Sequence, residues 1–205
     1  MVSKSAILVV DIQNSLVIDP RTKIPHATRV YEAGTRILEM ARQIRDTRVR
    51  EQNQPSNFII IFVQHHESPD EGPLVLGTEP WGLVFTPRQD LESMEEFIVG
   101  KSVRDAFSNP ALERTLRQHG AEELVVFGIQ SECCVEATCN GAINAGFTIT
   151  LLSGAHSTYP TPEAEPEDIE AQVEARLRAK GATVVGWEDA VNAWEKKGQI
   201  LGPYQ

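Results

Sequence analysis

The sequence predicts an α/β protein with a mostly parallel, Rossmann-like sheet of six strands between two helical layers, a three-layer α-β-α arrangement with expected strand order 3-2-1-4-5-6. Three observations predict this fold. Short apolar runs alternate with longer segments whose apolar residues recur at helical spacing. The first runs are apolar throughout, as in strands that are buried on both faces. Polar residues with reactive side chains directly follow several runs, as they do where strand ends form a site.

Strands are expected at the short apolar runs. In chain order these runs are 6–10, 58–63, 96–99, 124–127, 147–152 and 183–186. The first run ends at Asp11, and the weaker third run is followed by Gly100 and Lys101. Parallel strands present their carboxyl ends at one edge of the sheet, so we expect Asp11 and Lys101 to lie at the same edge.

Helices are expected between the strands. In chain order they are 28–49, 110–119, 131–145, 166–180 and 189–197. Pro110 at the start of the second helix and Gly120 just beyond it fit the usual punctuation of a helix, and Gly146 ends the third. The Pro- and Gly-rich stretch 65–90 has no such periodicity and is long enough to predict a functional loop or lid.

Length and composition predict one soluble domain over residues 1–205. The chain is 41% hydrophobic and 23% charged, which is ordinary for globular proteins. A formal net charge of −10 would repel phosphate backbones, so nucleic acid is not an expected partner. No apolar run approaches the roughly 20 residues of a membrane span, so no membrane partner is expected either.

Cysteine usage favours a reducing compartment, which we take to be the cytoplasm. The three cysteines all fall within 133–139, where they cannot form a disulfide framework. No CxxC or paired His and Cys spacing of a zinc site accompanies them. The cysteines are therefore candidates for chemistry or for packing.

One cysteine occupies a position that favours reactivity. The run 124–127 ends at Gly128, and the predicted helix that follows carries Cys134 in its first turns. Unpaired N–H groups and the positive end of the helix dipole favour a thiolate there. Together with Asp11 and Lys101 at two other strand ends, Cys134 could form a unit for acyl transfer.

These residues resemble a known family, the isochorismatase-like cysteine hydrolases, and the resemblance covers nearly the whole chain, in order, from residue 6 to about 159. Three motifs carry the resemblance, namely VVDIQN at 9–14, Lys101 with Ala106-Phe107, and GIQSECCVEAT at 128–138. The resemblance implies that Cys134 is a nucleophile, Asp11 its proton shuttle and Lys101 an electrostatic anchor. It also implies a cis peptide bond before Gln130, an oxyanion hole formed by the N–H groups of Gln130 and Cys134, no cofactor, and a homodimer or homotetramer.

The family motif selects Cys134 over Cys133, because the family nucleophile precedes a valine and lies three residues after a Ser or Thr. In a regular helix successive side chains differ by about 100°, so both thiols could not face one substrate atom. Cys133 and Cys139 are accordingly predicted to be small buried apolar residues.

The sequence departs from the metal-binding members of this superfamily. Nicotinamidases carry an Asp-x-His pair after the second strand and a further histidine nearby. Here Gln64 stands in place of the aspartate, and no histidine occurs between His66 and His119. No metal site is therefore expected. A second departure is Gly154-Ala155, where the family usually has Asp-Ala after the fifth strand.

The residues expected to contact a small-molecule substrate are Gln13, His66, Trp81 and Phe107. The resemblance puts Gln13, Trp81 and Phe107 around the mouth of the pocket, and an aromatic rim suits a small planar substrate. Packing in the core is the competing interpretation for each of these three. For His66 the alternative is a hydrogen-bonded residue in the pocket floor.

Three functions remain open from the sequence. The first is metal-independent hydrolysis of an amide, ureide or carbamoyl C–N bond through a Cys134 acyl-enzyme. The second is cleavage of a vinyl ether of isochorismatase type, in which Asp11 acts as general acid and no thiol is needed. The third is a non-catalytic thiol sensor or interaction protein. The retained Cys134 favours the first.

Overall fold

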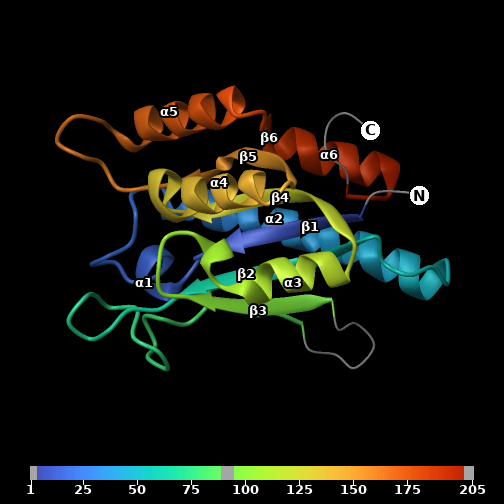
Figure 1. Cartoon of the computed structure of the whole chain (residues 1–205), viewed down its shortest axis with the longest axis horizontal. Helices are drawn as coiled ribbons and strands as arrows, with labels where there is room; N and C mark the ends of the chain where they lie inside the picture. Colours follow the sequence, from blue (N-terminus) through green and yellow to red (C-terminus); the bar gives the residue numbers. More distant parts are fainter. Residues whose placement is uncertain (1–3, 89–94, 201–205) are drawn as a thin grey trace.

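A parallel sheet forms the centre of the molecule in the computed structural model, which describes residues 4–88 and 95–200. Its strand order is β3-β2-β1-β4-β5-β6, and each neighbouring pair is parallel (Figure 1). The strands are β1 Lys4–Val10, β2 Phe58–His65, β3 Glu96–Lys101, β4 Ala121–Ile129, β5 Thr148–Ser157 and β6 Thr183–Gly186. The predicted α/β class and strand order are confirmed.

Helices cover both faces of this sheet. They are α1 Asn14–Val17, α2 Ala27–Asp46, α3 Pro110–Gln118, α4 Glu136–Asn144, α5 Pro166–Ala179 and α6 Trp187–Lys197. Two π-helical turns, Thr47–Glu51 and Ser131–Val135, and one 3₁₀ turn, Ala106–Ser108, complete the described elements. Helices α1, α2 and α6 contribute to one core cluster, and α3, α4 and α5 to the other. Figure 1 shows α2 behind the sheet and α3 and α4 in front of it.

Strand β1 supplies both cores because its side chains alternate between the faces. Ile7 and Val9 pack with α2 and α6, whereas Leu8 and Val10 pack with the helices of the opposite face. All four side chains are fully buried. Burial of such side chains is worth about 1.5–3 kcal/mol each, which explains why the run reads as apolar throughout.

The main differences from the predicted elements have simple physical causes. Strand β5 continues to Ser157, five residues past its predicted end, because its polar residues after Leu152 turn inward instead of starting a loop. The turns α1 and Ala106–Ser108 span four and three residues, too few for a helical period to be visible. Between β2 and β3 the described residues form no helix or strand, as expected for the loop, although 89–90 fall outside the described residues.

Candidate active site

Three side chains from distant parts of the chain meet at the carboxyl edge of the sheet. The Lys101 ammonium donates to Asp11 Oδ2 at 2.6 Å and to Cys134 Sγ at 3.2 Å. Asp11 directly follows β1, Lys101 ends β3, and Cys134 lies in the π-helical turn after β4. Lys101 must reach across β2 to make these contacts, and its side chain is fully buried. The structure therefore brings together the three residues that the sequence singled out.

The backbone holds Asp11 in a constrained position. Its φ of 51° lies in the left-handed region, which is uncommon for a residue other than glycine. Its N–H donates to the carbonyl of Val63 at 3.0 Å, so the turn is anchored to the end of β2. Next to it, Gly128 has a φ of 142°, and a Cβ there would lie 2.1 Å from the carbonyl oxygen of Val10. Only glycine lets β1 and β4 approach this closely beside the site.

Cys134 is held by the packing of its own turn. Val135 next to it is fully buried in the core of the α3–α5 face. Thr138 Oγ1 accepts from the N–H of Ala106 at 3.2 Å and so ties the cysteine helix to the segment that follows Lys101. The peptide bond between Ile129 and Gln130 is cis.

Burial controls the electrostatics of Asp11 and Lys101. Burial raises the pKa of Asp11 well above its ordinary value, and the nearby Lys101 ammonium opposes this rise only in part. Burial also acts to lower the pKa of Lys101, but Asp11 and Cys134 outweigh it, and the pKa of Lys101 is raised. Lys101 is therefore cationic, and Asp11 has the higher proton affinity that a proton carrier needs.

The two neighbouring thiols share one cavity, which corrects the prediction for Cys133. Cys133 is only half-buried, and its Sγ lies 3.8 Å from Cys134 Sγ. The residues lie in a π-helical turn, whose wider winding leaves a smaller angle between successive side chains than an α-helix does. Cys139 is fully buried and does behave as a small apolar residue.

The pair also titrates together. A hydrogen bond from Cys134 lowers the pKa of Cys133 to about 7. The same hydrogen bond, followed by burial, raises the pKa of Cys134, and Lys101 opposes that rise. Cys134 is therefore a thiol that needs a base to remove its proton, and Asp11, which accepts from the same Lys101 ammonium and itself acts to lower the pKa of Cys134, is the nearby base.

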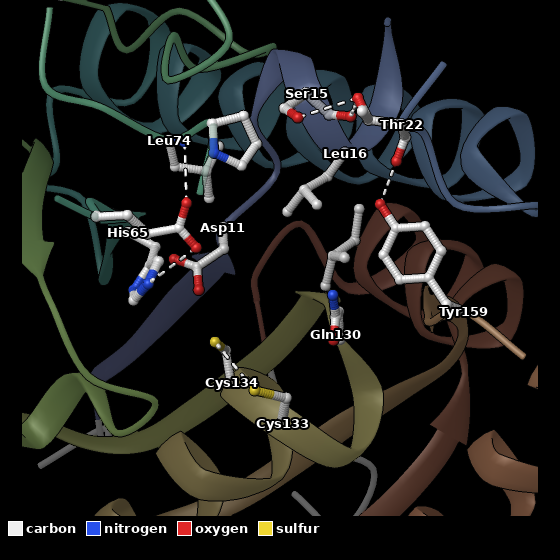
Figure 2. A pocket seen from close by; sticks show the side chains of 13 residues that line it. Asp11, Ser15, Leu16, Thr22, His65, Leu74, Gln130, Cys133, Cys134 and Tyr159 are labelled. Atoms are coloured by element: carbon white, nitrogen blue, oxygen red, sulfur yellow. Dashed lines mark hydrogen bonds and ion pairs between the residues drawn. The ribbon is translucent and has the colours of Figure 1, made fainter. Parts of the chain in front are cut away.

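A cavity of about 450 Å³ opens onto these groups. Figure 2 shows Asp11 and His65 on one side of it, the two cysteines beneath, and Gln130 and Tyr159 on the opposite side. The Cys134 sulfur points toward Asp11 in this view. The side chains of Leu16, Leu74 and Ile129 form an apolar part of the cavity wall. The volume is in the range of small-molecule sites.

The predicted substrate contacts Gln13 and Trp81 do not line this cavity. Gln13 is fully buried, and its Nε2 donates to the carbonyls of His65 at 3.0 Å and Trp81 at 2.7 Å. Its Oε1 accepts from the N–H of His65 at 2.9 Å. The Trp81 carbonyl also accepts from Gln64 Nε2 at 3.0 Å. Both residues therefore fix the loop after β2 to the start of α1, and substrate contact by them stays a prediction.

His66 and Phe107 also lie outside the lining of this cavity, and substrate contact by them stays a prediction. Strand β2 extends to His65, and strand alternation directs His65 to the face of Lys101, with His66 following outside the strand. His65 lines the cavity, whereas His66 is absent from its lining among the described residues. Phe107 packs on Phe147, with ring centroids 5.7 Å apart, and lies partly buried against the core.

His65 and Tyr159 line the cavity although neither was predicted to contact substrate, and Glu67, which follows His66 in the sequence, lines it as well. His65 Nδ1 lies 3.2 Å from Lys101 Nζ. Since an ammonium only donates, Nδ1 accepts and the ring proton sits on Nε2. Tyr159 donates its hydroxyl hydrogen to the carbonyl of Thr22, which joins the end of β5 to the segment before α2. A predicted strand that ended at residue 65 instead of 63 would have indicated that His65 faces the site. No pattern in the sequence indicates that Tyr159 does.

Asp11 retains a free acceptor. Its Oδ1 is buried and has no hydrogen-bond partner within the described chain, while Oδ2 accepts from Lys101. Asp11 lines the cavity, so Oδ1 is available to a group that enters it. The arrangement can move a proton between the thiol and a bound molecule.

No group of three or more His, Cys, Asp or Glu side chains within 4–88 and 95–200 is placed to hold a metal ion. The same described residues contain no helix that is long and apolar enough to cross a membrane.

The fold and this edge of the sheet define a three-layer α/β protein in which an aspartate, a lysine and a cysteine from three strand ends meet at a small-molecule cavity. The chain belongs to the isochorismatase family, since the model of the Isochorismatase domain matches residues 5–189.

Known relatives agree with this assignment. The chain is 29% identical over 177 residues to a streptothricin hydrolase of Streptomyces noursei, covering 86% of this chain but only 57% of that protein. Its fold is similar to a putative isochorismatase from Burkholderia xenovorans, with a TM-score of 0.77 at 20% identity over 98% of this chain and 92% of the other. An N-carbamoylsarcosine amidase from Thermoplasma acidophilum gives a TM-score of 0.67 at 20% identity over 90% and 97% of the two chains.

Proposed function

We propose that the protein is a hydrolase of small molecules that cleaves a C–N bond of an amide, ureide or carbamoyl group through an acyl-enzyme on Cys134. One observation carries this proposal. The Lys101 ammonium contacts both the Asp11 carboxylate and the Cys134 sulfur beside a small-molecule cavity. A cation between a base and a thiol stabilises the thiolate that forms when the proton leaves.

The mechanism begins with proton transfer. Asp11 takes the proton of Cys134, and Sγ attacks the carbonyl carbon of the substrate. The carbonyl electrons move to oxygen, and the N–H groups of Gln130 and Cys134 donate to the resulting oxyanion. Both of these residues line the cavity. Two such donors would each lower the barrier by about 3 kcal/mol.

Collapse of this intermediate breaks the C–N bond. The protonated Asp11 gives its proton to the leaving nitrogen, which departs as a neutral amine or ammonia. A water molecule then attacks the thioester while Asp11 takes one of its protons, and the thiolate of Cys134 is regenerated and reprotonated. The higher proton affinity of Asp11 suits its use in both directions.

The names of relatives support C–N cleavage. An N-carbamoylsarcosine amidase shares the fold, and a ureidoacrylate amidohydrolase of Methylobacterium radiotolerans is 30% identical over 100 residues.

A second candidate is vinyl-ether hydrolysis by Asp11 as general acid. Burial that raises the pKa of Asp11 favours this alternative, because a higher proton affinity suits a general acid. The contact of Lys101 with the Cys134 sulfur favours C–N cleavage, since hydrolysis of a vinyl ether requires no thiol.

Substitution of single residues separates the two candidates. Cys134→Ser should lower kcat/KM on a hydrolysed amide by at least about a thousandfold, within the range of lost nucleophiles. Cys133→Ser is the matched control, since the Lys101 ammonium donates to the sulfur of Cys134 and has no hydrogen bond to that of Cys133 in the described chain, and it should retain most activity. Asp11→Asn should abolish turnover under either mechanism. Full activity in Cys134→Ala would rule out covalent catalysis by this thiol.

A further inference from the structure

Glu67 places a fixed carboxylate in the wall of the cavity. Its Oε2 accepts from the N–H of Leu74 at 3.0 Å, and only 23% of its side chain is exposed. A Cβ on Gly72 would lie 2.1 Å from this same oxygen, so the loop closes directly against the carboxylate. The loop after β2 is therefore shaped around Glu67 and holds it in place.

No cation among the described residues of the wall neutralises Glu67. His65 Nε2 lies 3.9 Å from Glu67 Oε1, but burial and the nearby Lys101 lower the pKa of His65, so its ring is neutral. The Lys101 ammonium is already engaged by Asp11 and Cys134. Arg104 acts on the pKa of Cys133 from outside the cavity lining. The described lining contains no lysine or arginine.

The loop that carries Glu67 is also negatively charged. Between His66 and Arg88 the sequence contains Glu67, three further acidic residues, and no lysine or arginine. Together with the formal net charge of −10, this loop makes the approach to the cavity electronegative. An anionic ligand would meet repulsion at the wall, while a cationic one would find an unneutralised partner.

Asp11 provides the second fixed point for a ligand. Its Oδ1 is buried, lines the cavity and has no partner among the described residues, so it can accept from the N–H of an amide. His65 lies between Glu67 and Lys101. A ligand that meets both carboxylates must therefore span an imidazole ring, which requires a chain of several atoms between its two polar ends.

We propose that this site selects substrates that carry a primary ammonium or guanidinium group a few atoms from the scissile amide, with Glu67 binding the cation. The assignment of the scissile bond rests on the proposed function, whereas the preference for a cation rests on Glu67 and can be measured without turnover. A charge-assisted contact to a partly buried carboxylate should favour a cation over a neutral isostere by about tenfold.

Three matched amides test the proposal, namely 4-aminobutanamide, pentanamide and glutaramate, which share an amide and three methylenes and differ in the charge of the far end. Binding is measured by calorimetry on the full-length Cys134→Ala protein, and hydrolysis on the wild type. We expect 4-aminobutanamide to bind about tenfold more tightly than pentanamide, and glutaramate more weakly than either. Glu67→Gln should reduce the ratio between the first two to near one, because the amide keeps the Leu74 contact without the charge.

Asp70→Asn is the matched control, since it removes one charge from the same loop at an exposed position outside the cavity lining, and it should keep the preference. A circular dichroism melt verifies that each variant is folded. Equal binding of the three amides, tightest binding of glutaramate, or a preference that survives Glu67→Gln would overturn the proposal. Cation-selective binding without hydrolysis of any amide would support the role of Glu67 and instead count against C–N cleavage.

Discussion

At the scale of single residues, Lys101 connects the groups on which the proposed chemistry depends. Its ammonium contacts Asp11, Cys134 and His65 within 3.2 Å, and its side chain is fully buried. A buried ammonium is costly unless it is paired, so these contacts also keep Lys101 charged. One lysine thus acts to lower the pKa of a carboxyl, a thiol and an imidazole, although burial is the larger cause for the carboxyl and the imidazole.

Removal of this charge should shift the pH dependence of activity. Lys101→Met removes the group that opposes the rise in the pKa of Asp11, so that pKa should rise further. Because the base form of Asp11 is needed, the acidic limb of kcat/KM should move to higher pH, with a loss of at least about a hundredfold at neutral pH. Lys101→Arg retains the charge and should shift the limb less. An acidic limb at the same pH in Lys101→Met would contradict the role given to Lys101.

The two thiols give a second test at this scale. Cys134→Ala removes the hydrogen bond that lowers the pKa of Cys133 to about 7, so the pKa of Cys133 should rise toward that of an ordinary thiol. The rate of alkylation of Cys133 by iodoacetamide, followed by mass spectrometry as a function of pH, reports this pKa. A Cys139→Ala variant leaves the pair intact and is the control. An unchanged pKa would mean that the thiols do not interact.

At the scale of elements, an ion network joins α2 to the edge strand that carries Lys101. The side chain of Glu96 in β3 is fully buried and accepts from Arg42 at 2.7 Å, from Arg45 at 3.1 Å and from the N–H of Arg88 at 2.8 Å. Arg45 is itself only 1% exposed. The network holds β3 in place. Lys101 lies at the end of this strand, and its side chain reaches across β2.

Loss of Glu96 should therefore destabilise the fold. Glu96→Gln leaves the buried Arg45 with only its 3.8 Å contact to Asp46 as an ion pair among the described residues, and should lower the free energy of unfolding by about 3 kcal/mol at pH 7, measured by urea unfolding. Glu39→Gln, which breaks an exposed ion pair in α2, should change it by less than about 0.5 kcal/mol. A loss in Glu96→Gln no larger than in Glu39→Gln would show that the network contributes little.

The same network predicts a dependence on pH. Burial acts to raise the pKa of Glu96, but its bonds to Arg42 and to the N–H of Arg88 outweigh it, and the pKa lies below 4.5. A depressed pKa contributes stability above the unfolded value, and this contribution is lost as pH falls through the folded pKa. The difference between wild type and Glu96→Gln should therefore shrink as pH falls below about 4.5. A constant difference down to low pH would contradict the ion pairing.

At the scale of the whole molecule, the sheet and the three strand-end residues could be predicted because buried parallel strands appear as apolar runs. The substrate side of the cavity could not be predicted. It depends on the loop after β2, which has no periodicity, and on a two-residue extension of that strand, which brings His65 rather than His66 to Lys101. The prediction that Cys133 is buried was wrong because the spacing of residues in the sequence does not distinguish a π-helical turn from an α-helical one.

The charge of the whole molecule gives a further prediction, which rests on the inferred cation preference. A formal net charge of −10 should attract a cationic substrate from a distance. Screening shortens the range of this attraction from about 30 Å at 0.01 M salt to about 8 Å at 0.15 M. The kcat/KM for 4-aminobutanamide should therefore fall severalfold over this range, while that for pentanamide stays nearly constant. Parallel salt dependence of the two would argue against electrostatic attraction.

The central claim is that Cys134 carries the acyl group during turnover, and trapping the intermediate tests it most directly. An amide that the wild type hydrolyses is mixed with the protein, quenched with acid during the steady state, and analysed by intact-mass and peptide mass spectrometry. We expect an increase equal to the mass of the acyl group less the one hydrogen it replaces, located on Cys134, in the wild type and in Cys133→Ser. An acyl group on Cys133, or undiminished turnover in Cys134→Ala, would contradict the mechanism.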